Sequence, residues 1–164
     1  MPAALHRAPP LSVRAWINTP PLTLEALRGK VVMLHVFQLH CPACVELATP
    51  QAQRAHQRLS SGGVVVLGLH SVFERHDEAD AAALDRYVRQ QGLTFPIGID
   101  EPDGEGGIPL TMRAYQLDGT PSTVLVDAAG QLRMKRLGHL GDVELGVALG
   151  RLLHEAEHSA ERAH

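Results

Sequence analysis

The chain has few of the features that would place it in a membrane or a secretory pathway. None of its hydrophobic runs approaches the roughly 20 residues needed to cross a bilayer. The first residues contain one early arginine but are interrupted by prolines, and they lack the apolar segment of a signal peptide. We therefore expect no membrane association and, if the sequence is the whole gene product, a cytoplasmic location.

The chain also lacks a large excess of charge of either sign. The net charge is −3, from 15 Lys and Arg against 18 Asp and Glu, and no basic stripe appears, which argues against nucleic acid as a ligand. Hydrophobic residues make up 45% of the chain, as in ordinary globular proteins. The length of 164 residues suits one domain. We expect this domain to span 11–158, with a flexible proline-rich tail over 1–10 and a frayed end at 159–164.

Cysteine is scarce as well, and the two that are present stand close together. Cys41 and Cys44 follow the apolar, largely β-branched run 31–37, which predicts a buried strand, a short turn and then a helix. Pro42 suits a first helical turn, so Cys41 is expected at the helix N-terminus, where the dipole stabilises a thiolate. The spacing indicates a redox pair. Cys-x-x-Cys also occurs in zinc sites, which need two further ligands at recognisable spacing.

The remaining patterns predict an α/β domain with a mixed central β-sheet flanked by helices. Strands are expected over 11–17, 64–69, 93–99, 121–126 and 132–137, and helices over 45–59, 77–91, 109–116 and 142–157. We expect Pro50 to kink the first of these helices. Asp77 is a candidate N-cap of the second, and Gly92 its end.

The order of these elements resembles the thioredoxin superfamily, and within it the TlpA/ResA-type thiol–disulfide oxidoreductases, or redoxins. The residues HCPAC, 40–44, stand where the family has Trp-Cys-x-x-Cys. The segment 111–132 is similar to the family's Tyr-x-x-x-Gly-x-Pro segment, apolar strand and Asp-x-x-Gly turn. The likeness covers about 16–153 and implies a thioredoxin-like fold. It also implies that Pro121 is a cis proline facing the disulfide, and that Thr120, Pro121 and Pro42 bind substrate.

The resemblance implies thiol–disulfide exchange as the reaction. Cys41 as thiolate attacks a disulfide in a partner protein or small molecule, and Cys44 then attacks the mixed disulfide. No metal or organic cofactor is implied, only an external electron donor. The direction of the reaction and the oligomeric state stay open.

Two histidines depart from the family pattern and are further candidate catalytic residues. His40 replaces the usual Trp, and it could lower the thiol pKa of Cys41 as a cation or shape the substrate surface. His35 stands where thioredoxins carry a buried Asp. A neutral imidazole could handle protons for Cys44 there, or it could be a core histidine bonded to a backbone carbonyl.

Two other functions share this fold. Peroxiredoxins carry Pro seven and Thr three residues before their reactive Cys, whereas this chain has Leu34 and Gln38 at those positions. Sco-type copper proteins use two cysteines and a distant His, but their cysteines lie one residue further apart, and the ten histidines here show no ligand spacing. Both functions stay as alternatives to disulfide exchange.

Overall fold

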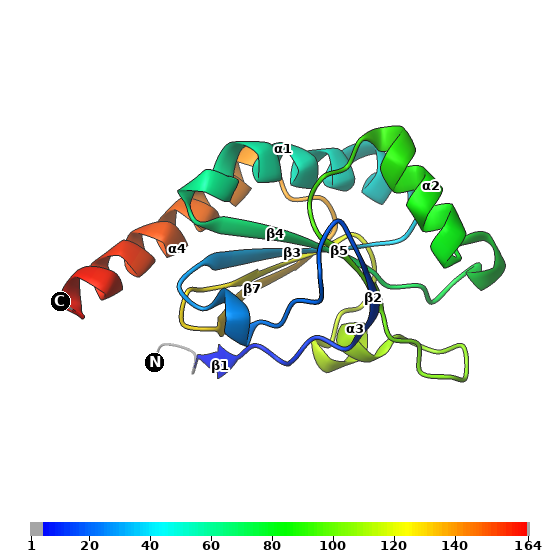
Figure 1. The fold of residues 1–164 in the computed structure, drawn as a ribbon, viewed down its shortest axis with the longest axis horizontal. Coiled ribbons are helices and arrows are strands. Elements are labelled where there is room, and N and C mark those ends of the chain that lie inside the picture. The colour runs from blue at the N-terminus through cyan, green and yellow to red at the C-terminus, as the bar shows by residue number, and fades with distance from the viewer. Residues whose placement is uncertain (1–4, 164) are drawn as a thin grey trace.

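The computed structural model describes residues 5–163 as one mixed sheet with helices on both faces (Figure 1). The strand order is β1-β7-β6-β3-β4-β5-β2. The strands are β1 His6–Arg7, β2 Val13–Ile17, β3 Val31–Phe37, β4 Val64–His70, β5 Ile97–Asp100, β6 Ser122–Val126 and β7 Gln131–Leu137. The helices are α1 Thr49–Leu59, α2 Ala81–Gln91, α3 Leu110–Ala114 and α4 Asp142–Arg162. The predicted α/β architecture is confirmed.

Strand β3 lies at the centre of the sheet, and every one of its seven residues is buried. It pairs in parallel with β4 and antiparallel with β6. A strand that is covered on both faces reads as a continuous apolar run, which is the pattern of 31–37. β5 extends the parallel part beyond β4, so the carboxyl ends of β3, β4 and β5 meet at one edge of the sheet.

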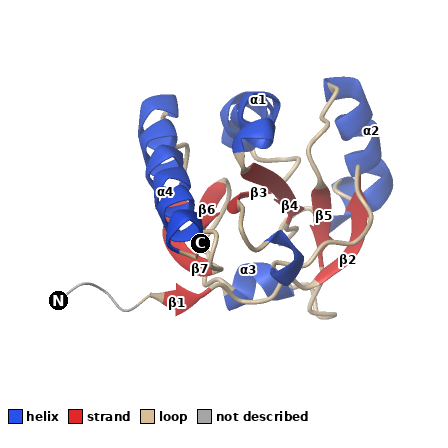
Figure 2. Cartoon of the chain, turned by 60° about the vertical axis from the view of Figure 1, so that its left-hand side comes forward, coloured by secondary structure: helices blue, strands red, loops and turns tan. Residues whose placement is uncertain are grey.

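Helices α1, α2 and α4 cover one face of the sheet, and α3 covers the other (Figure 2). The first face buries apolar side chains of all three helices together with Cys44 and Phe37. The second face buries Met112 of α3 and Tyr115 against side chains of β3, β4 and β6. Two apolar cores therefore hold the sheet, and the two cysteines belong to the side covered by α1.

The helix after the cysteines differs from the expected kinked α-helix. Residues Cys44–Ala48 form a π-helical turn, in which the N–H of Thr49 bonds to the carbonyl of Cys44, five residues back. Pro50 then lies in the first turn of α1. Proline has no N–H to donate, and the wider turn accommodates this loss without a break in the helix.

Helix α2 begins later than its sequence pattern indicates. Asp80, not Asp77, is the N-cap, and its carboxylate accepts the N–H of Ala83 at 2.8 Å. Residues His76–Glu78 form a separate 3-10 turn, and the buried Ala79 separates this turn from the N-cap of α2. The helix ends at Gly92, as predicted, and this glycine adopts the left-handed conformation.

Both described ends of the chain contain regular structure. His6 and Arg7 pair with β7, and Ala8 is buried. At the other end, α4 continues through Arg162. The flexible tail over 1–10, the domain bounds of 11–158 and the fraying from 159 stay predictions. Residues 1–4 and 164 lie outside the described part of the chain. No helix within 5–163 has the length and apolar character to cross a membrane.

Candidate active site

Cys41 and Cys44 lie just beyond the carboxyl end of the central strand. They are joined as a disulfide, with their Cα atoms 5.1 Å apart. Cys44 is completely buried, whereas Cys41 is partly exposed. A partner can therefore reach the sulfur of Cys41 but not that of Cys44.

The Cys41 sulfur has two backbone neighbours. The N–H of Cys44 donates to Cys41 Sγ at 3.2 Å, so a helix-terminus donor points at the sulfur on which a thiolate would form. On the other side, the carbonyl oxygen of Thr120 lies 3.5 Å from Cys41 Sγ. The bond between Thr120 and Pro121 is cis. The fold thus places the Thr-Pro segment against the cysteine that is exposed to a partner.

Gln38 connects the segments around the disulfide, a role that the sequence did not indicate. Its Nε2 donates to Thr120 Oγ1 at 3.3 Å. Its Oε1 accepts the backbone N–H groups of Phe73 and Glu74 at 3.1 and 3.3 Å. One buried amide therefore ties the cysteine turn to the loop after β4 and to the Thr-Pro segment.

His35 lies in the core on the side of the sheet that carries α1. Its Nε2 forms a 2.8 Å hydrogen bond with Thr49 Oγ1, and its ring stacks on Phe37 at 5.0 Å. Burial lowers the pKa of His35 to about 3, so this imidazole is neutral at neutral pH. Its partner is a hydroxyl group rather than the backbone carbonyl that was one of the two expectations.

His40 points away from the core, toward the 3-10 turn before α2. Its Nε2 donates to the carbonyl oxygen of Glu78 at 3.0 Å, and the Glu78 carboxylate lies 3.6 Å away. This contact joins the residue before Cys41 to the neighbouring loop. Pro42, which follows Cys41, is exposed at the first helical turn.

The structure therefore brings Cys41, Cys44 and Thr120 into one site, with His40 on its rim and His35 in the core. Within residues 5–163, no three His, Cys, Asp or Glu side chains come together as possible ligands of a metal ion. The residues that the sequence missed are Gln38 and Thr49. Their side chains act through partners distant in sequence, and no local pattern marks them.

Comparison with known proteins places this site among thiol-dependent redox proteins. The model of the AhpC/TSA family matches residues 5–135. A thiol-disulfide isomerase from Corynebacterium glutamicum is 46% identical, with a TM-score of 0.84 over 89% of this chain and 96% of that one. A second crystal structure, of a thioredoxin-like superfamily protein, is 41% identical, with a TM-score of 0.87 over 90% of this chain and 96% of that one.

Curated relatives are longer than this chain. Protein DipZ of Mycobacterium bovis is 30% identical over 88% of this chain but only 20% of its own length. Thiol-disulfide oxidoreductase ResA of Halalkalibacterium halodurans is 26% identical over 68% of this chain and 56% of its own length. The chain thus spans between a fifth and somewhat more than half of these two relatives.

Proposed function

The chain belongs to the AhpC/TSA family, and we propose that it is a thiol–disulfide oxidoreductase that exchanges electrons with a disulfide-containing protein or small molecule through Cys41 and Cys44. One observation carries the proposal. The accessible sulfur of Cys41 accepts the N–H of Cys44, whose own sulfur is buried behind it. The names of the similar isomerase and of ResA support the same reaction class.

The proposed reaction has two steps. In the reduced protein, the Cys41 thiolate attacks a disulfide sulfur of the substrate, which breaks the S–S bond, releases one substrate thiolate and leaves a mixed disulfide. Cys44 then loses its proton and attacks Cys41 Sγ, which releases the second substrate thiolate and forms the Cys41–Cys44 disulfide. The substrate gains two electrons, and an external donor returns them to the protein. No step needs a metal or an organic cofactor.

We assign the transfer of the Cys44 proton to the buried pair of His35 and Thr49. Cys44 is fully buried, so water has no direct access to its thiol. Thr49 links the two residues, because its N–H bonds to the Cys44 carbonyl and its hydroxyl bonds to His35 Nε2, and a neutral His35 can accept a proton transiently. In this role His35 carries no permanent charge, so it does not act as a cation that lowers a thiol pKa.

His40, Pro42, Thr120 and Pro121 form the surface that meets the substrate. The hydrogen bond from His40 to Glu78 favours the role of shaping that surface over the role of activating Cys41 by charge. The Thr120 carbonyl, already 3.5 Å from Cys41 Sγ, is available to accept a backbone N–H of a bound peptide. A disulfide-containing protein can therefore bind at this surface through its own backbone.

The experiment that tests this function compares the wild type with Cys41→Ser and Cys44→Ser. Each protein is equilibrated in dithiol–disulfide buffers of known potential, and free thiols are counted by alkylation and mass. We expect a two-electron transition in the wild type that both variants lack. A midpoint near about −270 mV would indicate a reductase, and one above about −180 mV an oxidant or isomerase.

The second readout is a trapped intermediate. Cys44→Ser should accumulate a mixed disulfide between Cys41 and a disulfide substrate, whereas Cys41→Ser should accumulate none. A wild-type protein that keeps both thiols reduced across the whole range of potentials would contradict the proposal.

Peroxide reduction has less support, because the carboxamide of Gln38 is already bonded to Thr120, Phe73 and Glu74. The cytoplasmic location stays a prediction, which fractionation of cells that express the full gene would test.

A further inference from the structure

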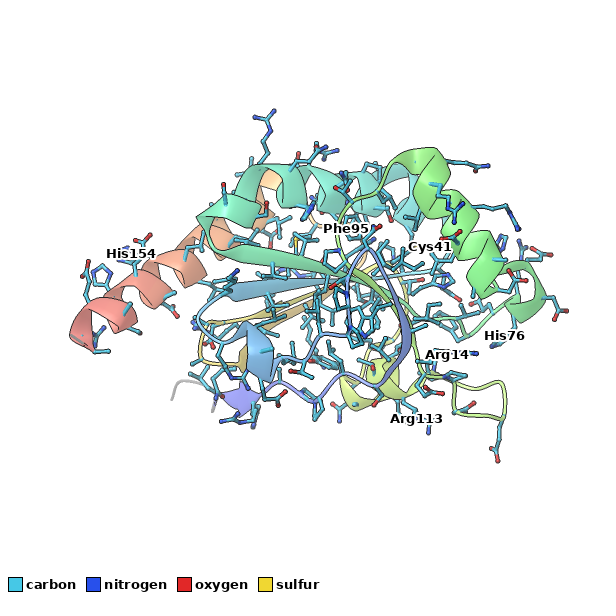
Figure 3. The ribbon with its side chains drawn as sticks, in the orientation of Figure 1. Arg14, Cys41, His76, Phe95, Arg113 and His154 are labelled. Carbon is cyan, nitrogen blue, oxygen red and sulfur yellow. A yellow bond between two sulfur atoms is a disulfide. The ribbon has the colours of Figure 1, made fainter. Side chains whose placement is uncertain are left out.

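A cavity of about 410 Å³ lies at the carboxyl ends of β4 and β5, beside α2. We call it the His70 cavity. Its walls are largely apolar, and its polar lining comes from Arg14, His70, His76, Asp80 and Asp100. Figure 3 shows Arg14 and His76 on the same side of the molecule as Cys41. A cavity of this size, with apolar walls and few polar groups, has the character of a small-molecule site.

His70 makes this cavity unusual. It is the last residue of β4 and is 1% exposed, yet its Nε2 has no hydrogen-bond partner, alone among the buried side-chain nitrogen and oxygen atoms of residues 5–163. An unpaired buried polar atom destabilises a fold unless something satisfies it. Burial, reinforced by the charge of His40, lowers the pKa of His70 to about 4. The ring is thus neutral, and its Nε2 is buried without a partner.

Two nitrogen-bearing side chains of the cavity lining are left without a partner. Among the described residues, neither Arg14 nor His76 forms an ion pair with an acidic side chain. The two acidic residues of the lining already bind protein donors: Asp80 caps α2, and both oxygens of Asp100 accept hydrogen bonds. The N–H groups of Arg14 and His76 are therefore free to donate to a carboxylate.

The cavity is coupled to the redox pair through two contacts. His40, next to Cys41, bonds to Glu78 in the same 3-10 turn that supplies His76 to the cavity. His70 pairs with Phe37 across β3 and β4, and their rings lie 5.3 Å apart. Phe37 belongs to the same core cluster as Cys44.

We propose that the His70 cavity binds a carboxylate-bearing end of a low-molecular-weight disulfide substrate whose sulfur reacts at Cys41. Arg14 and His76 bind the carboxylate at the rim, and the free nitrogen of His70 bonds a polar group deeper in the cavity. This inference rests on the proposed function, and it names the substrate class that the function would act on.

Binding is tested separately from the reaction by the use of the oxidised protein. It holds no thiolate and therefore cannot exchange with an added disulfide. Dithiodipropionate, a small disulfide with two carboxylates, is titrated into the wild type and followed by amide and imidazole NMR signals. The neutral diamide of the same compound is the matched control ligand. We expect saturable shifts at Arg14, His70 and His76 with the acid, and binding of the diamide that is roughly threefold to tenfold weaker.

Two variants test the assigned residues. Arg14→Gln should weaken binding of the acid roughly threefold to tenfold and leave the diamide unchanged, whereas Arg58→Gln, the same change on an exposed residue of α1, should alter neither. His70→Leu should weaken binding of both the acid and the diamide while the melting temperature stays the same or rises, because the unpaired nitrogen is gone. A purely structural His70 would instead lower the melting temperature and leave binding unchanged, which would overturn the proposal.

The reaction supplies the last test. The reduced wild type should reduce the acid with a higher kcat/KM than the diamide, and Arg14→Gln should remove the difference. Three results would overturn the proposal. The acid could fail to bind saturably, the acid and the diamide could bind equally, or a preference for acidic groups could be found only with protein disulfides. Binding of the acid without reduction of either compound would leave the site in place and contradict the proposed function instead.

Discussion

Acidification should destabilise this protein through two buried histidines. The pKa of His35 is lowered to about 3 and that of His70 to about 4, in both cases mainly by burial. An unfolded histidine has a pKa of about 6.5. Between these values the unfolded chain binds protons that the folded protein does not. Stability therefore rises with pH in this range and is lost as the pH falls below about 6.5.

The size of the effect follows from the same values. From about pH 7 to about pH 5, each neutral buried imidazole contributes about 2 kcal/mol to the loss of stability, or about 4 kcal/mol for the pair. Burial raises the pKa of Asp100, which acts in the opposite direction at lower pH. The range between about pH 7 and about pH 5 is therefore the one in which the histidines should dominate.

The assay is urea unfolding of the oxidised protein at several pH values, followed by circular dichroism. His70→Leu should remove about half of the pH dependence, and histidine NMR signals should assign two rings that are still neutral at about pH 5. A free energy of unfolding that changes by less than about 1 kcal/mol over this range would refute the reasoning. So would both rings titrating near their ordinary pKa.

Three further variants test the packing around the site. Gln38→Ala should lower the free energy of unfolding by about 1–3 kcal/mol, because two buried backbone N–H groups lose their acceptor, and it should slow exchange as the Thr-Pro segment is released. Thr49→Val should also cost about 1–3 kcal/mol, because it leaves His35 Nε2 unpaired in the core. Gly68→Ala should destabilise by about 1–3 kcal/mol, since its new Cβ would meet Phe95 at 2.8 Å. Urea unfolding measures all three.

Matched control variants show whether a loss of stability comes from the lost contact or from any substitution of the same kind. Gln57→Ala, on an exposed position of α1, should change stability by less than about 0.5 kcal/mol. Gly146→Ala, in α4, meets nothing within 4 Å and should raise stability by about 0.5–1 kcal/mol. If Gly146→Ala and Gly68→Ala had the same effect, the packing argument at Gly68 would be wrong.

The sequence alone was sufficient for the central strand and the placement of the cysteines. The apolar run before Cys41 and the proline after it act over a few residues, so local patterns predict a buried strand that leads into a helix terminus. Where two local signals competed, the tertiary structure decided. Both Asp77 and Asp80 can cap a helix, but Asp80 caps α2, whereas Asp77 lies in the 3-10 turn before it. The sequence predicts a kinked helix at Pro50, and the structure instead has a π-helical turn just before this residue.

Contacts between distant segments belong to the tertiary structure. The Thr120 carbonyl reaches Cys41 across 79 positions of sequence, and only the pairing of β3 with β6 brings the two together. The partner of His35 and the unpaired nitrogen of His70 depend in the same way on which side chains surround them in the core. A sequence pattern shows that a residue is buried, but the hydrogen bonds and charges that it then meets come from chain segments that only the fold places beside it.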